Sequence, residues 1–227
     1  MLSNDVVQLR RFATGLDIPN PAFNEQQRAD AAPRSTGGDG FITSGDVVQG
    51  RRYATGLDPL TDAGGPTAPS LAPDSISGLI DEIKKYFFGR EMRVGSQTVG
   101  IGKQVVVPVE LTPNGDETAM SFTLEYDPNV LANPRVTLGD FAPAGSTLTF
   151  NINEPGRIGI LIDSTESMTA SAMPKELLTV TFDVIGDGEG TTEVKLTGSL
   201  AAIGLSDADG NSLAARYRDG KVVVHRK

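Results

Sequence analysis

The chain has 227 residues, of which 38% are hydrophobic and 22% charged, a composition typical of a folded protein with at least one packed core. It contains no cysteine, so neither disulfides nor thiolate-bound metals can hold the fold. A formal net charge of -9 would repel nucleic acid phosphates, and no apolar run is long enough to span a bilayer. We therefore expect no nucleic acid partner and no membrane insertion.

A repeated stretch opens the chain: NDVVQLRRFATGLD at 4–17 returns as GDVVQGRRYATGLD at 45–58. Apolar residues in each copy recur at helical spacing, and Gly15 and Gly56 stand where a left-handed cap would end a helix. Each copy predicts one short helix, and neither helix could bury its apolar side alone. Residues 1–58 are therefore expected to form a small module of two helices packed on each other.

The segment before the second helix matches the later half of an EF-hand-type calcium loop. Asp39 and Asp46 offer carboxylates, Gly40 permits the sharp turn, and Phe41 offers its backbone carbonyl. The earlier half is irregular, because the nearest upstream acid, Asp30, lies too far back for the usual register. Two alternatives follow. Either the intervening residues bulge and Asp30 still reaches a bound Ca²⁺, or the loop is held by its own turns with Asp46 as a helix N-cap.

Residues 59–74 are rich in proline and glycine and predict a linker. They are followed by DSISGLIDEIKKYFFG, whose apolar residues recur at three-four spacing and predict a short amphipathic helix over 75–89. Its polar side carries both acids and lysines, which favours docking on a neighbouring domain over binding at a membrane surface.

From residue 90 to 227 the hydrophobic period changes from three-four to two. Alternating or β-branched runs, separated by Gly, Asn, Asp and Pro turns, predict short strands with no helices between them. The runs are KQVVVPVEL, AMSFTLEYD, GRIGILIDS, ELLTVTFDVI, TTEVKLTG and GKVVVHR. This pattern is typical of a β-sandwich. A second acidic stretch at 207–211 lacks a closing carboxylate, since Arg218 holds that position, and a hairpin turn is expected there.

Catalytic constellations are not evident in the sequence. The single histidine, His225, stands near the chain end beside two basic residues and is expected to be a solvated surface group. Acids on sandwich strands are expected to form solvated faces rather than a glycosidase pair, and no phosphate-binding glycine loop is present. We expect a protein that is not an enzyme.

The two repeats, with GDGFITSGDVVQGRRYATGLD as the better copy, resemble the dockerin module of cellulosome-type assemblies. The segments VGSQTVGIGKQVVVPVEL, SFTLEYDPNVL, GRIGILIDS, LLTVTFDVIG and DGKVVV resemble, in the same order, the partner of that module, the cohesin domain. The resemblance covers 1–58 and about 92–226. It implies a mainly β protein in which an EF-hand-type, two-helix dockerin-like module precedes a nine-stranded, cohesin-like jelly-roll β-sandwich.

The resemblance also implies which residues bind a partner. Dockerins recognise a cohesin through a polar pair just before the closing acid of the loop and a basic pair on the following helix. The corresponding positions here are Ser44, Gly45, Arg51 and Arg52 in the second repeat and Ser3, Asn4, Arg10 and Arg11 in the first. The first repeat retains only Asp5 of its loop. The chain is therefore expected to have lost upstream sequence, a secretion signal included.

The expected function is that of an extracellular or cell-surface adaptor without catalytic activity, serving a polysaccharide-degradation or cell-surface system. Its partners would be proteins that carry a cohesin or a dockerin. Docking within one chain and head-to-tail association of copies are both open. The alternative is a carbohydrate-binding sandwich of a secreted protein, although the chain has no Trp to offer a sugar platform.

Overall fold

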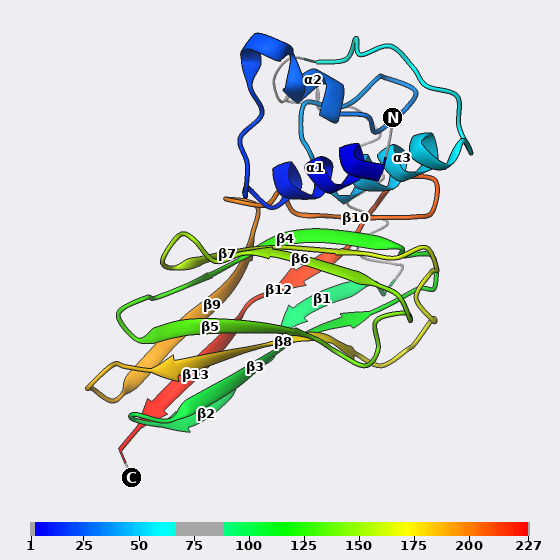
Figure 1. Ribbon diagram of the computed structural model, residues 1–227. Helices are drawn as coiled ribbons and strands as arrows, with labels where there is room; N and C mark the ends of the chain where they lie inside the picture. The colour runs from blue at the N-terminus through cyan, green and yellow to red at the C-terminus, as the bar shows by residue number, and fades with distance from the viewer. Residues whose placement is uncertain (1–2, 67–88, 227) are drawn as a thin grey trace, which may run out of the picture.

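The computed structural model describes residues 3–66 and 89–226, and the backbone alone of Ser3. Within these residues a helical module lies on one side of a β-sandwich, and the C-terminus lies at the end of the sandwich far from the helices (Figure 1). The predicted helix over 75–89, apart from Gly89, and the second part of the predicted linker lie outside the described residues. No helix among those described is both long and apolar enough to cross a membrane.

The helical module, defined here as residues 3–66, is built on the two repeats. Its helices are α1 (Ser3–Ala13), the 3-10 helix η1 (Pro21–Phe23), α2 (Glu25–Ala29) and α3 (Ser44–Thr55). The repeat helices are confirmed, and Gly15 and Gly56 follow them with positive φ of 70° and 73°. Helices α1 and α3 pack on each other through Val6, Leu9 and Val47. The segment between them adds two short helices to the predicted pair.

The start of α3 is fixed by a capping box. Thr43 is the N-cap residue and its side chain accepts from the backbone of Gly45, while the Asp46 carboxylate accepts from the backbone N–H of Thr43. Asp46 therefore stands at the third helical position, not at the N-cap that the metal-free alternative assigned to it. This arrangement satisfies helix N–H groups that would otherwise lack acceptors.

The sandwich contains thirteen strands among the described residues, not the nine expected. They are β1 (Glu91–Val94), β2 (Gln97–Gly100), β3 (Gln104–Thr112), β4 (Ala119–Tyr126), β5 (Leu131–Leu138), β6 (Thr147–Asn151), β7 (Arg157–Asp163), β8 (Lys175–Val184), β9 (Gly190–Thr197), β10 (Gly204–Ser206), β11 (Ser212–Leu213), β12 (Arg216–Arg218) and β13 (Gly220–His225). One sheet has the order β12-β1-β3-β8-β5. The other has the order β11-β10-β4-β9-β13-β2, with β7 paired to β4 and β6 paired to β7.

The larger strand count has a local cause. The first predicted run, KQVVVPVEL, forms β3, and two short strands precede it: β1, which pairs with β3, and β2, which pairs with β13 of the other sheet. A side chain at Gly95, between them, would stand 2.6 Å from Pro108. The strands β10, β11 and β12 are two or three residues long, too short for an alternating pattern to reveal. The turn at 207–211 joins β10 to antiparallel β11, which confirms the predicted hairpin.

The core lies between the two sheets and follows the period of two. On β3, Val105, Val107, Val109 and Leu111 are buried, and the residues between them are exposed or half-buried. This alternation is expected for a sheet whose outer side is solvated. Strands β4 and β7 depart from it, and they form the candidate site.

Candidate functional site

The outer face of strands β4 and β7 is buried as completely as their inner face. On β7, Ile158, Ile160 and Ile162 belong to the sandwich core, yet the alternating residues Leu161 and Asp163 are also 0% and 2% exposed. A sheet face turned to water would show exposed residues at these positions. Figure 1 shows the reason, since α1 and α3 lie over this face. We call this surface, made by β4, β7 and β10, the docking face.

Asp163 is the charged centre of the docking face. Its Oδ2 lies 2.6 Å from Nη2 of Arg10, and its Oδ1 lies 2.6 Å from Nη1 of Arg51. The Asp163 side chain is 1% exposed, while those of Arg10 and Arg51 are 20% and 19% exposed. A buried carboxylate is tolerable only where charges and hydrogen bonds compensate its lost hydration, and here two guanidinium groups do so.

Ser44, the first residue of α3, contacts the docking face through both its backbone and its side chain. Its N–H donates to Oγ of Ser121 on β4 at 3.2 Å, and its hydroxyl shares a hydrogen bond of 2.9 Å with the hydroxyl of Ser206 on β10. Ser44 is 1% exposed. The next residue, Gly45, is buried, and a Cβ there would meet the carbonyl oxygen of Gly210 at 3.1 Å. The helix start therefore approaches the face closely.

Apolar contact completes the docking face. Leu161 of β7 belongs to the hydrophobic cluster of the helical module and not to the sandwich core; the other buried members are Val6, Leu9, Ala13, Ala29 and Val47. Beside it, Asn151 Nδ2 donates to the carbonyl oxygen of Thr14 at 3.2 Å. A Cβ on Gly159 would lie 2.5 Å from the same oxygen, so only glycine permits this approach.

The second arginine of each pair, Arg11 or Arg52, binds an acid of the helical module and not Asp163. Arg52 binds Asp58 within the module, and its Nη1 also lies 2.7 Å from Asp209 Oδ1 in the turn after β10. Arg11 binds Asp17, the equivalent acid of the first repeat, and no described contact joins it to the sandwich. Their guanidinium groups are the main cause that lowers the pKa of Asp17 and of Asp58 to about 2.

Two other predicted partner-binding residues stand apart from this contact. Asn4 is exposed, and the side chain of Ser3 is not described. Five of the eight predicted residues touch the sandwich through interactions or close approach: Arg10, Ser44, Gly45, Arg51 and, through the 207–211 turn, Arg52.

The loop before α3 brings the predicted calcium residues together in a different manner. Residues 31–38 form a bulge. Across its base, the Asp30 carboxylate accepts hydrogen bonds from the N–H groups of Asp39 at 2.9 Å and Gly40 at 2.6 Å. Oδ1 of Asp46 accepts from Ala31 and Ala32 at 2.6 and 2.8 Å. Oδ2 of Asp46 accepts from the N–H and the hydroxyl of Thr43 at 2.7 and 3.1 Å.

These residues do not fit a calcium ion in the described arrangement. Both oxygens of Asp46 are occupied by protein donors, Asp39 Oδ1 accepts from the N–H of Phe41, and the described residues contain no group of three or more Asp, Glu or His side chains placed to hold a metal. Burial is the largest cause that raises the pKa of Asp46, to about 7, against the effect of its amide donors. Burial likewise raises the pKa of Asp30 and of Asp39.

The acceptor residues on the sandwich were not predicted from the sequence. One signal was present: the run IGILID at 158–163 does not alternate, a property that it shares with VVVPV at 105–109 and VVV at 222–224. A continuous apolar strand is expected to be buried on both faces. This signal would have placed β7, with Leu161 and Asp163, among three candidate strands without distinguishing it from β3 and β13.

A β-sandwich with one outer face shaped for two helices defines a protein–protein interaction module. The sequence model of the cohesin domain matches residues 91–224, so the chain belongs to the cohesin family. Cohesin domains are non-catalytic scaffold modules that bind dockerins. The match begins after the helical module, whose likeness to a dockerin stays a prediction.

Solved cohesins share the fold. A non-cellulosomal cohesin from the archaeon Archaeoglobus fulgidus is 22% identical with a TM-score of 0.52, covering 60% of this chain and 91% of its own. The seventh ScaB type I cohesin from Pseudobacteroides cellulosolvens is 24% identical with a TM-score of 0.52, over 61% and 93%. A chain of the Coh-OlpA-Doc918 type I cohesin–dockerin complex from Clostridium thermocellum is 20% identical, also with 0.52, over 60% and 99%. No curated protein matches the sequence significantly.

Proposed function

We propose that this chain is a non-catalytic adaptor whose cohesin sandwich binds the dockerin-like helical module of the same chain. The observation that carries the proposal is Asp163, a carboxylate 1% exposed that is paired with Arg10 and Arg51 from the two repeats. Removing either partner from such a pair leaves a buried charge without compensation. The charges therefore match only when the module lies on the docking face.

The apolar and neutral polar contacts between the helical module and the docking face also support docking. The docking face offers an apolar side chain at Leu161, hydroxyl partners for Ser44, and a glycine at 159 where the backbone of Thr14 comes close. Interfaces that bind specifically combine a buried apolar centre with satisfied polar groups in this way. A face intended for solvent would have needed none of these features.

Docking within one chain is favoured over docking between copies. The module and the sandwich are joined by residues 67–88, and a tether between two binding parts gives effective concentrations on the order of millimolar. A second copy at micromolar concentration competes poorly with that. At high concentration the same face could accept the module of another copy, and repeated head-to-tail contacts would then build chains.

We also propose an extracellular or cell-surface setting in a polysaccharide-degradation or cell-surface system, supported by the resemblance to cellulosome-type modules. The carbohydrate-binding alternative has no described feature in its favour. A pull-down with insoluble polysaccharides would test it directly, since retention of the chain on any of them would support it.

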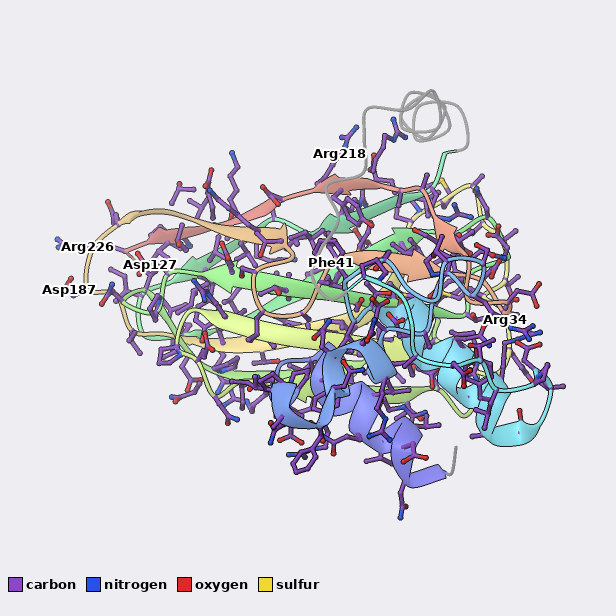
Figure 2. All side chains as sticks on the ribbon, turned by 90° about the horizontal axis from the view of Figure 1, so that it is seen from above. Arg34, Phe41, Asp127, Asp187, Arg218 and Arg226 are labelled. Carbon is purple, nitrogen blue, oxygen red and sulfur yellow. The ribbon has the colours of Figure 1, made fainter. Side chains whose placement is uncertain are left out.

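Separating the two parts of the chain tests the proposal. A protease site placed within 67–88 allows the folded chain to be cleaved and then analysed by size-exclusion chromatography at about 10 µM, where an interface of this kind should persist. We expect the two fragments to elute together, and to separate in an Asp163→Ala chain. Asp187→Ala is the matched control, because Asp187 is exposed and lies away from the helical module (Figure 2). Separation of the unmodified fragments would contradict the proposal.

A further inference from the structure

We infer that protein N–H and O–H donors close the loop at 30–46 where an EF-hand-type loop would hold calcium, so that the helical module folds and lies on the sandwich without the ion. The inference concerns the internal structure of the module. It stands or fails separately from the proposed function, because a calcium-dependent module could dock equally well.

The first ground is the occupancy of the Asp46 carboxylate. An ionised carboxylate has about four acceptor positions on its two oxygens. Ala31 and Ala32 donate to Oδ1, and Thr43 donates twice to Oδ2, all between 2.6 and 3.1 Å. A calcium ion bound by both oxygens would need the same lone pairs and would face the positive ends of these donors. The ion and the donors therefore exclude each other.

The second ground is the closure of the bulge by Asp30. Its two oxygens accept separately from the backbone of Asp39 and Gly40, which joins the start of the loop to its end. Gly38 has a φ of +117°, and a Cβ there would overlap the Asp30 carboxylate at 2.3 Å. The backbone thus lies directly against Asp30.

The third ground is the way the loop leads into the docking face. The Asp46 donors include the N-cap residue Thr43, and the next residue, Ser44, binds Ser121 and Ser206 of the sandwich. Asp39 has a smaller part, since its Oδ1 accepts only a local bond from Phe41. The bonds of Asp30 and Asp46 are therefore sufficient to set the start of α3 and place Ser44 on the face.

The test compares hydrogen exchange in the full chain with and without calcium. After treatment with EDTA, the chain is measured by mass spectrometry in about 5 mM CaCl₂ and in about 5 mM MgCl₂, a concentration that would saturate even a weak site. We expect exchange in peptides over 30–46 to agree within about threefold between the two ions, because no bond in the loop depends on calcium. Exchange slowed by calcium by more than this factor would overturn the inference.

Two variants make the test sharper. Asp39→Asn keeps the oxygen that accepts from Phe41, so exchange over 30–46 should stay within about threefold of the unmodified chain in both buffers. Asp46→Asn loses the acceptor capacity of one oxygen, so exchange should be faster by about tenfold or more in both buffers. A calcium-dependent protection that Asp39→Asn abolishes would contradict the inference, even if Asp46→Asn fails to fold.

Discussion

Arg10 and Arg51 occupy equivalent positions in the two repeats, and each donates to a different oxygen of the Asp163 carboxylate at 2.6 Å. One acid of the sandwich thus fixes both helices of the module at once. Such a contact requires α1 and α3 to lie side by side with one arginine from each helix directed to β7. The two helices do pack on each other, and the repeat gives each of them an arginine at the equivalent position.

Asp163→Asn should weaken docking by about 2–5 kcal/mol, the usual cost of breaking a buried charge pair. The asparagine keeps the size of the side chain but presents an N–H₂ group to one of the two guanidinium groups. Hydrogen exchange in peptides of α1 and α3 within the full chain measures the effect. Asp187→Asn should leave that exchange unchanged, and equal effects from the two substitutions would refute a specific role for Asp163.

Gly159→Ala should loosen the module while leaving the sandwich as stable as before or more so. The added Cβ would stand 2.5 Å from the Thr14 carbonyl oxygen, so α1 must shift, at a cost of about 1–3 kcal/mol. Within the strand itself, alanine in place of glycine gains about 0.5–1 kcal/mol.

The control for Gly159 is Gly190→Ala on β9, where no atom lies within 4 Å of the added Cβ. Hydrogen exchange of the module and of the sandwich, followed separately, distinguishes the two substitutions. Unchanged exchange in α1 of the Gly159→Ala chain would show that Thr14 does not approach β7.

Leu161→Ala and Ile160→Ala are neighbouring substitutions with opposite expected targets. Leu161 packs in the cluster of the module, whereas Ile160 packs in the sandwich core. Each should cost about 2–5 kcal/mol, the first from docking and the second from the stability of the sandwich. Hydrogen exchange measured at rising temperature, separately in peptides of the module and of the sandwich, distinguishes a loss of docking from a loss of sandwich stability. Loss of sandwich stability in the Leu161→Ala chain, to the extent seen with Ile160→Ala, would contradict the assignment.

Acid should destabilise the sandwich partly through Glu117, which is fully buried and accepts from Arg90 Nε at 2.5 Å. Burial alone would raise the pKa of Glu117, but Arg90 and the N–H groups of Asn114 and Gly115 lower it on balance. A folded-state pKa below the unfolded value of about 4.3 means that the stabilisation is complete above that pH and is lost as the pH falls through the folded pKa.

Glu117→Gln should therefore lower the melting temperature at pH 7 and make it less sensitive to pH below about pH 4 than in the unmodified chain. Melting temperatures measured from pH 7 to pH 3 check this. Parallel curves for the two chains would show that Glu117 does not contribute to acid sensitivity.

The sequence predicted what depends on local periodicity. The repeats identified α1 and α3 with their glycine ends, and alternating sequences such as that of β4 identified a β-sandwich. It did not predict thirteen strands, because β10, β11 and β12 have too few residues to show a period, and β1 and β2, of four residues each, lie before the first predicted run. Those features depend on which distant segments pair, and a single sequence does not state that.

The candidate site was predicted from one side only. The resemblance to dockerins predicts the arginines as partner-binding residues, but their acceptor, Asp163, is a single acid among many in the chain. The loop at 30–46 was likewise predicted only in part. Its carboxylates are the residue types that bind calcium, whereas their occupancy by the backbone of Ala31, Ala32 and Thr43 follows from a bulge that spacing alone does not determine.

The most direct test of docking within one chain is a disulfide between Ser44→Cys and Ser206→Cys. The two hydroxyl oxygens lie 2.9 Å apart, and the chain has no other cysteine to interfere. Since a disulfide requires Cβ atoms about 3.5–4.5 Å apart, only a docked module can form it readily. A matched control pairs Ser44→Cys with Ser96→Cys, an exposed position beside β2 at the other end of the sheet order. Under mild oxidation at low concentration, we predict a cross-link within monomers for the first pair and none for the control. A first pair that stays reduced, or that links only separate copies, would contradict the account.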